Sequence, residues 1–394
     1  MRPRRAASGK GRVIRATLMT GVALAMLLAT FAFISPTSAV GISPSARMLH
    51  RMIYDSRSDR IVLYGGGPAF HAASVNDMWA YDVLGRLWTE LRPSTLPMVG
   101  DGSMAYDSQS DRTILLQNRE TWAYNLSSNT WTNMMPATSP PAPSEGRRGP
   151  RMAYDAESDR TILFGGLDAG FNSLFNDTWA YDFEANTWTE MRPAVHPPGR
   201  AYPGMTYVTG PDRILLFGGA VGNDRLNDTW AYDFNSNTWT DLNPATHPSA
   251  RGSPAMEFNR WVDRTILFGG VGPIPGDVVN NETWSFNYAA NAWVRLTTAV
   301  SPPPRAWHGM AYVNPLHVTV LFGGGPDRAT SYDDLWIYGS ETNTWRLETP
   351  LAPPTPSPPL LLIVAIGALI VAAVAVVSIL LRRRRTGGPR HGPE

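Results

Sequence analysis

The side chains best suited to recognise a ligand lie in loops that follow pairs of glycines. These are the longest and most varied loops of the chain, and variable loops on a fixed scaffold are where recognition usually resides. The candidate binding residues are an imidazole, an aromatic ring, two carboxylates and two guanidinium groups, at His71, Asp168, Phe171, Arg225, Asp277 and Arg328. We expect binding to belong to this set of loops rather than to any one residue.

Groups that could perform catalysis or hold a metal are few. Cysteine is absent, which excludes disulfides and thiolate metal sites. The seven histidines are scattered, and no pair has the spacing of a helical zinc-binding motif. The sequence predicts no catalytic residue, no cofactor and no metal, although a metal site assembled from distant parts of the chain stays open as an alternative.

Charge is distributed unevenly along the chain. The net charge is +1, but the first 40 residues hold six basic residues and no acid, and the last 44 hold five basic residues and one acid. Residues 41–350 therefore carry 23 basic and 32 acidic residues, a net charge of −9. Because nucleic-acid binding needs a basic stripe on the folded part, we expect no nucleic-acid partner.

The amino-terminal end is typical of an exported protein. Within residues 1–39, basic residues precede an apolar stretch from Ala16 to Ile34, and a segment of small residues ends at Ala39. This order predicts a secretory signal cleaved after Ala39. An uncleaved signal anchor is the alternative.

The carboxyl-terminal end predicts a single membrane anchor. Residues 360–381 contain no charge, and as a helix rising about 1.5 Å per residue they would cross a hydrocarbon core of about 30 Å. The basic tail at 382–394 follows directly, and clusters of arginine remain cytoplasmic. The proline-rich residues 351–359 before the span predict an extended stalk. We therefore expect a single-pass protein of the cell membrane, with its folded part outside and its tail in the cytoplasm.

An internal repeat determines the elements that position the candidate loops. Pairs of tryptophans, nine residues apart in most copies, recur six times: Trp79/Trp88, Trp122/Trp131, Trp179/Trp188, Trp230/Trp239, Trp284/Trp293 and Trp336/Trp345. Their first members are 43 to 57 residues apart. Repeats of this length form units that must stack on neighbours to bury their apolar faces.

Each repeat is predicted to contain four strands. In the third repeat, short runs rich in β-branched and aromatic residues are bounded by Gly, Asn, Asp or Ser, at 152–155, 161–164, 176–182 and 186–189. The second run is apolar throughout, as expected of a sheet covered on both faces. Asp159-Arg160 predicts a hairpin tip, and Trp188 can pack beside Trp179 and Tyr181 on the preceding strand.

Four-stranded sheets with two apolar faces bury both faces by stacking around an axis, which is a β-propeller. The sequence therefore predicts an all-β fold, a six-bladed propeller with four-stranded blades over residues 40–350, flanked by the amino-terminal hydrophobic helix and the carboxyl-terminal transmembrane helix. No strand is left over at either end, so the mode of ring closure stays open.

The repeat resembles the kelch repeat over roughly Arg47 to Glu348. An arginine precedes the methionine of the first strand by five residues in five repeats, at Arg47, Arg147, Arg200, Arg251 and Arg305. The glycine pair ends the second strand at Gly65-Gly66, Gly165-Gly166, Gly218-Gly219, Gly269-Gly270 and Gly323-Gly324. The second repeat departs most, with Gln117-Asn118 at that place and a shortened loop. WD40 propellers, the competing class, have a shorter period and dipeptides that are missing here.

The kelch resemblance implies binding by loops at one face of the ring, without implying one reaction. Galactose-oxidase-like chemistry needs a cysteine for its crosslinked tyrosine, which this chain lacks. The Asp-box turns of sialidases match only at Asp177-Thr178-Trp179 and Asp228-Thr229-Trp230, without the glycine. A sialic-acid-epimerase-like activity is the alternative that remains among enzymes.

Two repeated features are interpreted as structural. The arginine series recurs at one position of each repeat, which favours a hydrogen-bonding role in the scaffold over an anion site. Four glycosylation sequons begin at Asn125, Asn176, Asn227 and Asn281. Three share one repeat position, which favours turn or cap chemistry.

The sequence thus favours a surface-exposed, membrane-anchored propeller that acts as a binding or adhesion module for extracellular proteins or glycans. A kelch-type sugar-processing enzyme and a passive structural protein of the cell envelope are the alternatives. An enzymatic function is the less favoured of these interpretations.

Overall fold

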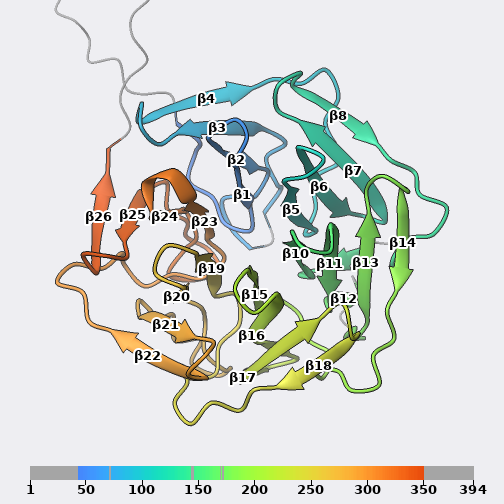
Figure 1. Cartoon of the computed structure of the whole chain (residues 1–394). Coiled ribbons are helices and arrows are strands. Elements are labelled where there is room, and N and C mark those ends of the chain that lie inside the picture. Colours follow the sequence, from blue (N-terminus) through green and yellow to red (C-terminus); the bar gives the residue numbers. More distant parts are fainter. Residues whose placement is uncertain (1–42, 71, 143–145, 169, 171–172, 350–394) are drawn as a thin grey trace, which may run out of the picture. The chain divides into compact units, whose positions relative to one another are not determined.

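The computed structural model describes residues 43–70, 72–142, 146–168, 170 and 173–349, within the compact unit Gly41–Leu351. This unit consists of six four-stranded antiparallel sheets arranged around an axis (Figure 1). The expected all-β fold, a six-bladed propeller with four-stranded blades, is confirmed. The predicted signal (1–39), stalk (351–359), membrane span (360–381) and tail (382–394) lie outside the described residues. Among the described residues, no helix is long and apolar enough to cross a membrane.

Every blade is built from four consecutive strands. The innermost strands are β1 (Arg51–Asp55), β5 (Ser103–Asp107), β10 (Arg151–Asp155), β15 (Gly204–Val208), β19 (Ala255–Asn259) and β23 (Gly309–Val313). The second strands are β2 (Arg60–Tyr64), β6 (Arg112–Gln117), β11 (Arg160–Phe164), β16 (Arg213–Val221), β20 (Arg264–Phe268) and β24 (Val318–Phe322).

The third strands are β3 (Met78–Asp82), β7 (Glu120–Asn125), β13 (Thr178–Asp182), β17 (Asp224–Asp233), β21 (Thr283–Asn287) and β25 (Leu335–Gly339). The outermost strands are β4 (Leu87–Leu91), β8 (Thr130–Asn133), β14 (Thr187–Glu190), β18 (Thr238–Asp241), β22 (Ala292–Leu296) and β26 (Thr344–Glu348). A short sheet of β9 (Arg147–Arg148) and β12 (Leu167–Asp168) and a 3-10 turn at Asn314–Leu316 are additions that the repeat pattern did not predict.

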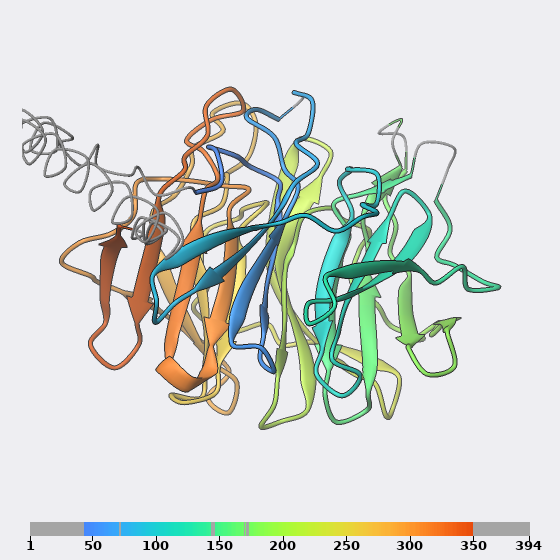
Figure 2. The same cartoon turned by 90° about the horizontal axis from the view of Figure 1, so that it is seen from above.

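The two faces of the ring differ in their connections (Figure 2). We call the face that carries the loops from second to third strands, and the connections between blades, the loop face. The opposite face, here the turn face, carries the tight turns within the hairpins. Asp159, at the predicted hairpin tip, has a φ of 56° between β10 and β11. The second repeat has a two-residue turn on the loop face, where Asn118 and Arg119 have φ of 49° and 77°. This is the shortened loop expected there.

The core lies between blades, because each sheet buries both of its faces. Ile162 of β11 is fully buried in a cluster with Trp230 of the next blade, whereas Leu163 faces a cluster with Trp188 of its own blade. Tyr181 and Trp188 are cross-strand partners with ring centroids 4.9 Å apart. This pair repeats around the ring and is the packing predicted from the tryptophan spacing.

The ring closes by packing between the first and last blades, without exchange of a strand. Met52 and Trp88 of the first blade share one buried cluster with Phe322 and Leu335 of the last. Gly324 N–H donates to the carbonyl of Arg47 at 2.9 Å, and the equivalent Gly166 N–H donates to Arg200 at 2.8 Å. Closure therefore repeats the contact that joins internal blades.

Candidate functional site

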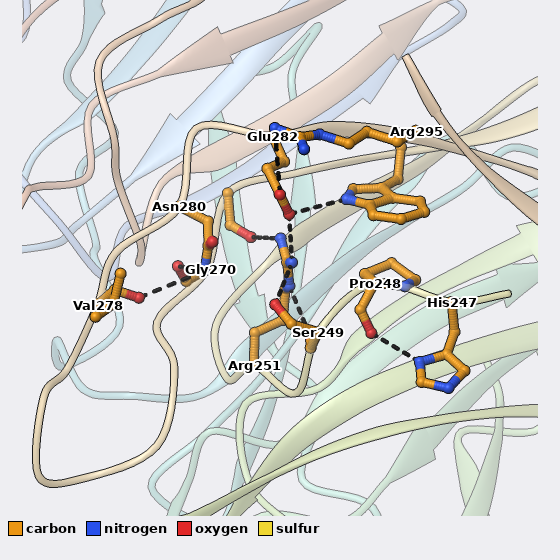
Figure 3. Close-up of polar contacts among 11 residues, drawn as sticks. His247, Pro248, Ser249, Arg251, Gly270, Val278, Asn280, Glu282 and Arg295 are labelled. Carbon is orange, nitrogen blue, oxygen red and sulfur yellow. Dashed lines mark hydrogen bonds and ion pairs between the residues drawn. The ribbon is translucent and has the colours of Figure 1, made fainter. Parts of the chain in front are cut away.

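The buried arginine series holds the loop face together. Figure 3 shows Arg251, whose guanidinium donates to Ser249, to the Gly269 carbonyl at 3.1 Å and to the Glu282 carboxylate at 2.7 Å. The same Glu282 oxygen accepts the Trp284 indole N–H at 3.0 Å, and Arg295 approaches the other oxygen at 3.4 Å. The arginine therefore ties the first glycine of its pair to the start of the third strand, which is the structural role inferred from its repetition.

The sequon position is explained by the same contacts. In Asn176-Asp177-Thr178, the Asp177 carboxylate accepts from Arg147 and from the indole of Trp179. The Thr178 hydroxyl accepts the indole N–H of Trp239 in the next blade at 2.9 Å. Both side chains after the asparagine thus have structural partners, as turn or cap chemistry would require.

A ring of backbone hydrogen bonds surrounds the axis at the loop face. It joins one residue from each blade. In each bond a backbone N–H donates to a backbone carbonyl, in the order Leu49 to Trp307, Trp307 to Ser253, Ser253 to Tyr202, Tyr202 to Gly149 and Gly149 to Asp101. Tyr202 and Trp307 adopt φ of 54° and 60°, which is uncommon for bulky residues. Such strain persists only where the surrounding structure enforces it, often at functional sites.

One gap in this ring is closed by a side chain. The Arg51 guanidinium donates to the carbonyl of Leu49 and to Asp101 Oδ1, the latter at 2.9 Å. Asp101 also accepts the hydroxyl of Tyr202. Burial raises the pKa of Tyr202 well above its usual value, and the negative charge of Asp101 adds to this effect. Tyr202 therefore remains a neutral donor at the centre of the face.

A cavity of about 530 Å³ opens above this ring on the loop face. Three aromatic side chains line it: the Phe70 ring lies 5.5 Å from that of Trp307 and 6.4 Å from that of Tyr202. The Arg328 guanidinium lies over Phe70, 5.3 Å from the ring centroid. A second cavity of about 340 Å³ shares Phe70 and Tyr202 and extends towards Asp101. The aromatic side chains of Phe70 and Tyr202 thus separate the two cavities at the loop-face end of the axis.

Charged residues from three blades meet at the edge of the larger cavity. Asp277 Oδ1 lies 3.9 Å from Arg225 Nη2, and Asp277 Oδ2 lies 3.6 Å from Arg328 Nη2. The Arg225 side chain is only 6% exposed, and burial lowers its pKa, which the charge of Asp277 opposes. Two guanidinium groups therefore share one carboxylate beside an aromatic cavity, an arrangement that favours an incoming anionic group.

The structure places the predicted binding residues in different ways. It brings Arg225, Asp277 and Arg328 together across the fourth, fifth and sixth blades. Asp168 instead organises its own loop by accepting the Ser173 N–H at 2.7 Å, and does not line the larger cavity. His71 and Phe171 lie outside the described residues.

The aromatic residues Phe70, Tyr202 and Trp307 are central to the cavity and were missed as candidates. Tyr202 and Trp307 each stand two residues after the repeat arginine. That position holds a leucine, glycine, tyrosine, serine or tryptophan in the five repeats with that arginine. A position that varies this much between otherwise regular repeats could have been recognised as one that faces the axis.

No group of three or more His, Asp or Glu side chains suited to a metal ion occurs in the described ranges. His50 and His308 pack edge-on against Phe322 and Phe268, with ring centroids 5.6 and 5.7 Å apart. Burial lowers the pKa of both histidines well below the usual value. They are neutral packing groups between blades.

Comparison with known proteins gives the family. The model described as "KLHDC2/KLHL20/DRC7 Kelch-repeats domain" matches residues 107–314 and 196–360. A flagellar outer-arm dynein alpha chain of Chlamydomonas reinhardtii is 28% identical over 43% of this chain and 4% of its own length. The human leucine-zipper-like transcriptional regulator 1 is 26% identical over 43% of this chain and 20% of its own. An F-box/kelch-repeat protein of Arabidopsis thaliana is 29% identical over 38% of this chain and 32% of its own length.

These matches cover at most about a third of each relative's length. The family model spans more than half of this chain and includes the repeats whose arginines and glycine pairs form the loop face. The chain belongs to the kelch-repeat family.

Proposed function

We propose that this kelch propeller is a protein-binding module whose partner enters the loop-face cavity. Kelch propellers commonly bind proteins. The observation that carries the proposal is the cavity of about 530 Å³, in which Phe70, Tyr202 and Trp307 stand beside Arg225 and Arg328. Aromatic and arginine side chains in a desolvated pocket are the residue types that dominate protein interfaces.

The chemistry of the cavity favours a segment that presents an acidic group next to an apolar side chain. Arg328 is 44% exposed at its side chain and shares Asp277 with Arg225. An incoming carboxylate would gain charge-assisted hydrogen bonds from these guanidinium groups. The apolar side chain would cover the rings below.

Capture by the purified full-length chain tests the proposal. We expect a partner identified by crosslinking to bind wild type and Arg57→Ala alike, because the Arg57 side chain is 74% exposed on the turn face. Arg328→Ala should weaken the same interaction, whereas Asp277→Ala should strengthen it, because it frees both guanidinium groups for the incoming carboxylate. Equal capture by all four proteins would place the interface elsewhere, and binding of a glycan alone would argue against a protein partner.

We also propose that the propeller is displayed outside the cell by the apolar segment at 360–381. The sequence order of signal, folded part, proline-rich stalk, apolar segment and arginine cluster supports this topology. The chain has no cysteine, so single introduced thiols report their side of the membrane. Leu84→Cys, at a side chain 70% exposed, should react with an impermeant maleimide in intact cells, and Gly388→Cys only after permeabilisation. The reverse pattern would overturn the topology.

A further inference from the structure

A third cavity lies on the turn face, at the opposite end of the axis from the two loop-face cavities described above. It measures about 340 Å³ and is surrounded by the ends of the innermost strands, which encircle the axis in Figure 1. One aromatic side chain from each blade lines it: Tyr54, Tyr106, Tyr154, Tyr207, Phe258 and Tyr312. The six residues share one repeat position, so the aromatic lining follows from the repeat.

In the first four blades the tyrosine hydroxyl is held by the neighbouring turn. Tyr54 donates to Asp59 at 2.8 Å, and Tyr106, Tyr154 and Tyr207 donate to the equivalent aspartates at 2.8 to 2.9 Å. These hydroxyls have partners within their own hairpins. The tyrosine rings are therefore fixed in orientation.

This hydrogen bond is missing in the last two blades. Phe258 has no hydroxyl to offer Asp263, and His317 stands in the sixth blade where the others have the aspartate. Tyr312 is only 7% exposed, and its hydroxyl has no hydrogen-bond partner in the part of the chain that the structure describes. An unpartnered buried hydroxyl is costly, so this side of the cavity departs from the repeat at a cost in stability.

A carboxyl group occupies the same side. Glu257 stands where the other blades have Ile53, Ala105, Ala153, Thr206 and Ala311. It lines both the turn-face cavity and the narrower cavity of about 110 Å³ above it in the channel. No ion pair involves Glu257 among the described residues. Burial raises its pKa to about 8, an effect that the backbone N–H of Tyr312 opposes.

The faces of aromatic rings attract organic cations, and a carboxylate beneath such rings supplies the counter-charge. We propose that the turn-face cavity binds an organic ammonium group. Glu257 is its counter-ion, and the six aromatic side chains around the axis form its wall. The site stands at the end of the axis that the proposed protein partner does not use. It does not depend on that function.

The charges around Glu257 narrow the class of ligand. Arg260 lines the same cavity and is exposed, and no ion pair involves it among the described residues. On the channel side, Arg51, Arg151, His50 and His308 line the adjoining space. Both histidines are neutral packing groups, and Arg51 is paired with Asp101. With Arg260 present, a ligand carrying an ammonium and an anionic group fits better than a dication.

Titration calorimetry on the full-length chain with choline, ethanolamine and glycine betaine tests the site. We expect one site per chain, with glycine betaine bound most tightly, and about tenfold weaker binding in Glu257→Gln, as loss of one charged partner would produce. Glu157→Gln, on an exposed turn of the third blade, is the matched control and should bind as wild type. Arg328→Ala, on the loop face, should also bind as wild type.

The protonation of Glu257 supplies a second readout. With a pKa of about 8, the carboxyl is mostly neutral at pH 6.5 and mostly ionised at pH 9, so affinity for choline should rise roughly sevenfold between them if the ionised form binds about tenfold more tightly. The Glu257→Gln protein should lose this dependence. Unchanged affinity in Glu257→Gln at pH 9, or no saturable binding of any of the three probes, would overturn the proposal and leave a cavity filled by water alone.

Discussion

Arg200 and Asp228 form a two-point ion pair, with Nη1 to Oδ1 at 2.6 Å and Nη2 to Oδ2 at 2.7 Å. Arg200 is fully buried, and Asp228 also accepts the Trp230 indole N–H at 2.8 Å. The pair joins the connection that enters the fourth blade to the start of its third strand. Three other blades contain an equivalent two-point pair, and in the fifth blade Arg251 contacts one oxygen of Glu282, so the loop face rests on repeated ion pairs of buried arginines.

Asp228→Ala is expected to destabilise the protein strongly. It leaves the Arg200 guanidinium buried without its counter-charge and removes a partner of Trp230, and breaking a buried pair on one side costs about 3–5 kcal/mol. The free energy of unfolding in urea measures this. Glu190→Ala breaks the exposed pair between Arg192 and Glu190, whose side chains are 79% and 33% exposed, and should cost at most about 1 kcal/mol. Similar losses in both variants would contradict the structural role of the arginine series.

The ring-closing interface should tolerate loss of an indole N–H better than an internal one. Trp188 Nε1 donates to the buried Thr121 hydroxyl at 2.8 Å. Trp88 Nε1 is buried and has no hydrogen-bond partner among the described residues, because Leu335 replaces the threonine in the sixth blade. Both Trp→Phe changes remove similar apolar area, but Trp188→Phe also leaves Thr121 unpaired. We expect Trp188→Phe to cost about 1–3 kcal/mol more in unfolding free energy than Trp88→Phe.

Equal losses in the two variants would show that the Thr121 hydrogen bond contributes little. A larger loss in Trp88→Phe would show that closure depends on the shape of that indole. Trp131, whose Nε1 lies 2.9 Å from the Met78 sulfur, provides an intermediate case because sulfur is a weak acceptor.

The fold could be predicted because its determinants are periodic. The spacing of Trp179 and Trp188 identified the two strands on which Tyr181 and Trp188 are cross-strand partners, and Gly165-Gly166 identified positions with φ of 69° and 105°. An added Cβ at Gly165 would lie 2.6 Å from the Arg200 carbonyl, so the glycine is required by the contact between blades. Closure was not predictable, because it depends on packing between residues more than 200 positions apart, such as Trp88 and Phe322.

The candidate site was predicted only in part, because its residues depart from the repeat. Arg225, Asp277 and Arg328 were candidates because they follow glycine pairs, although Arg225 lies in β17 and not in a long loop. Tyr202 and Trp307 lie inside the repeat frame, where a bulky residue is ordinarily assigned to the core. Their positive φ turns them towards the axis, and this is visible only once the backbone is known.

Arg119→Gly should stabilise the second blade. Asn118 and Arg119 form the two-residue turn between β6 and β7 with positive φ at both positions, and such turns strongly favour Asn-Gly. Arg119 is exposed, so we expect a gain of about 0.5–1 kcal/mol from relief of strain. Thermal unfolding measures it. Glu120→Gly, inside the adjoining strand, should instead destabilise by about 0.5–1 kcal/mol. A loss in Arg119→Gly would mean that its side chain makes a stabilising contact.

Glu257→Gln should remove a pH dependence of stability. The pKa of Glu257 is about 8 in the folded chain against 4.5 in an unfolded one. As pH rises from 4.5 towards 8, the unfolded chain ionises while the folded chain keeps the proton, so wild-type stability falls through this window. Because Glu257 is only partly buried, solvent screens its charge, and we expect about 2–4 kcal/mol of this loss to be absent in Glu257→Gln. Urea unfolding at pH 4.5 and 8.5 should give similar stabilities for the two proteins at the lower pH and a more stable Glu257→Gln at the higher. Glu184→Gln, at an exposed side chain, should follow wild type at both. If Glu257→Gln also parallels wild type, the carboxyl is already ionised at neutral pH and has a counter-charge in the channel.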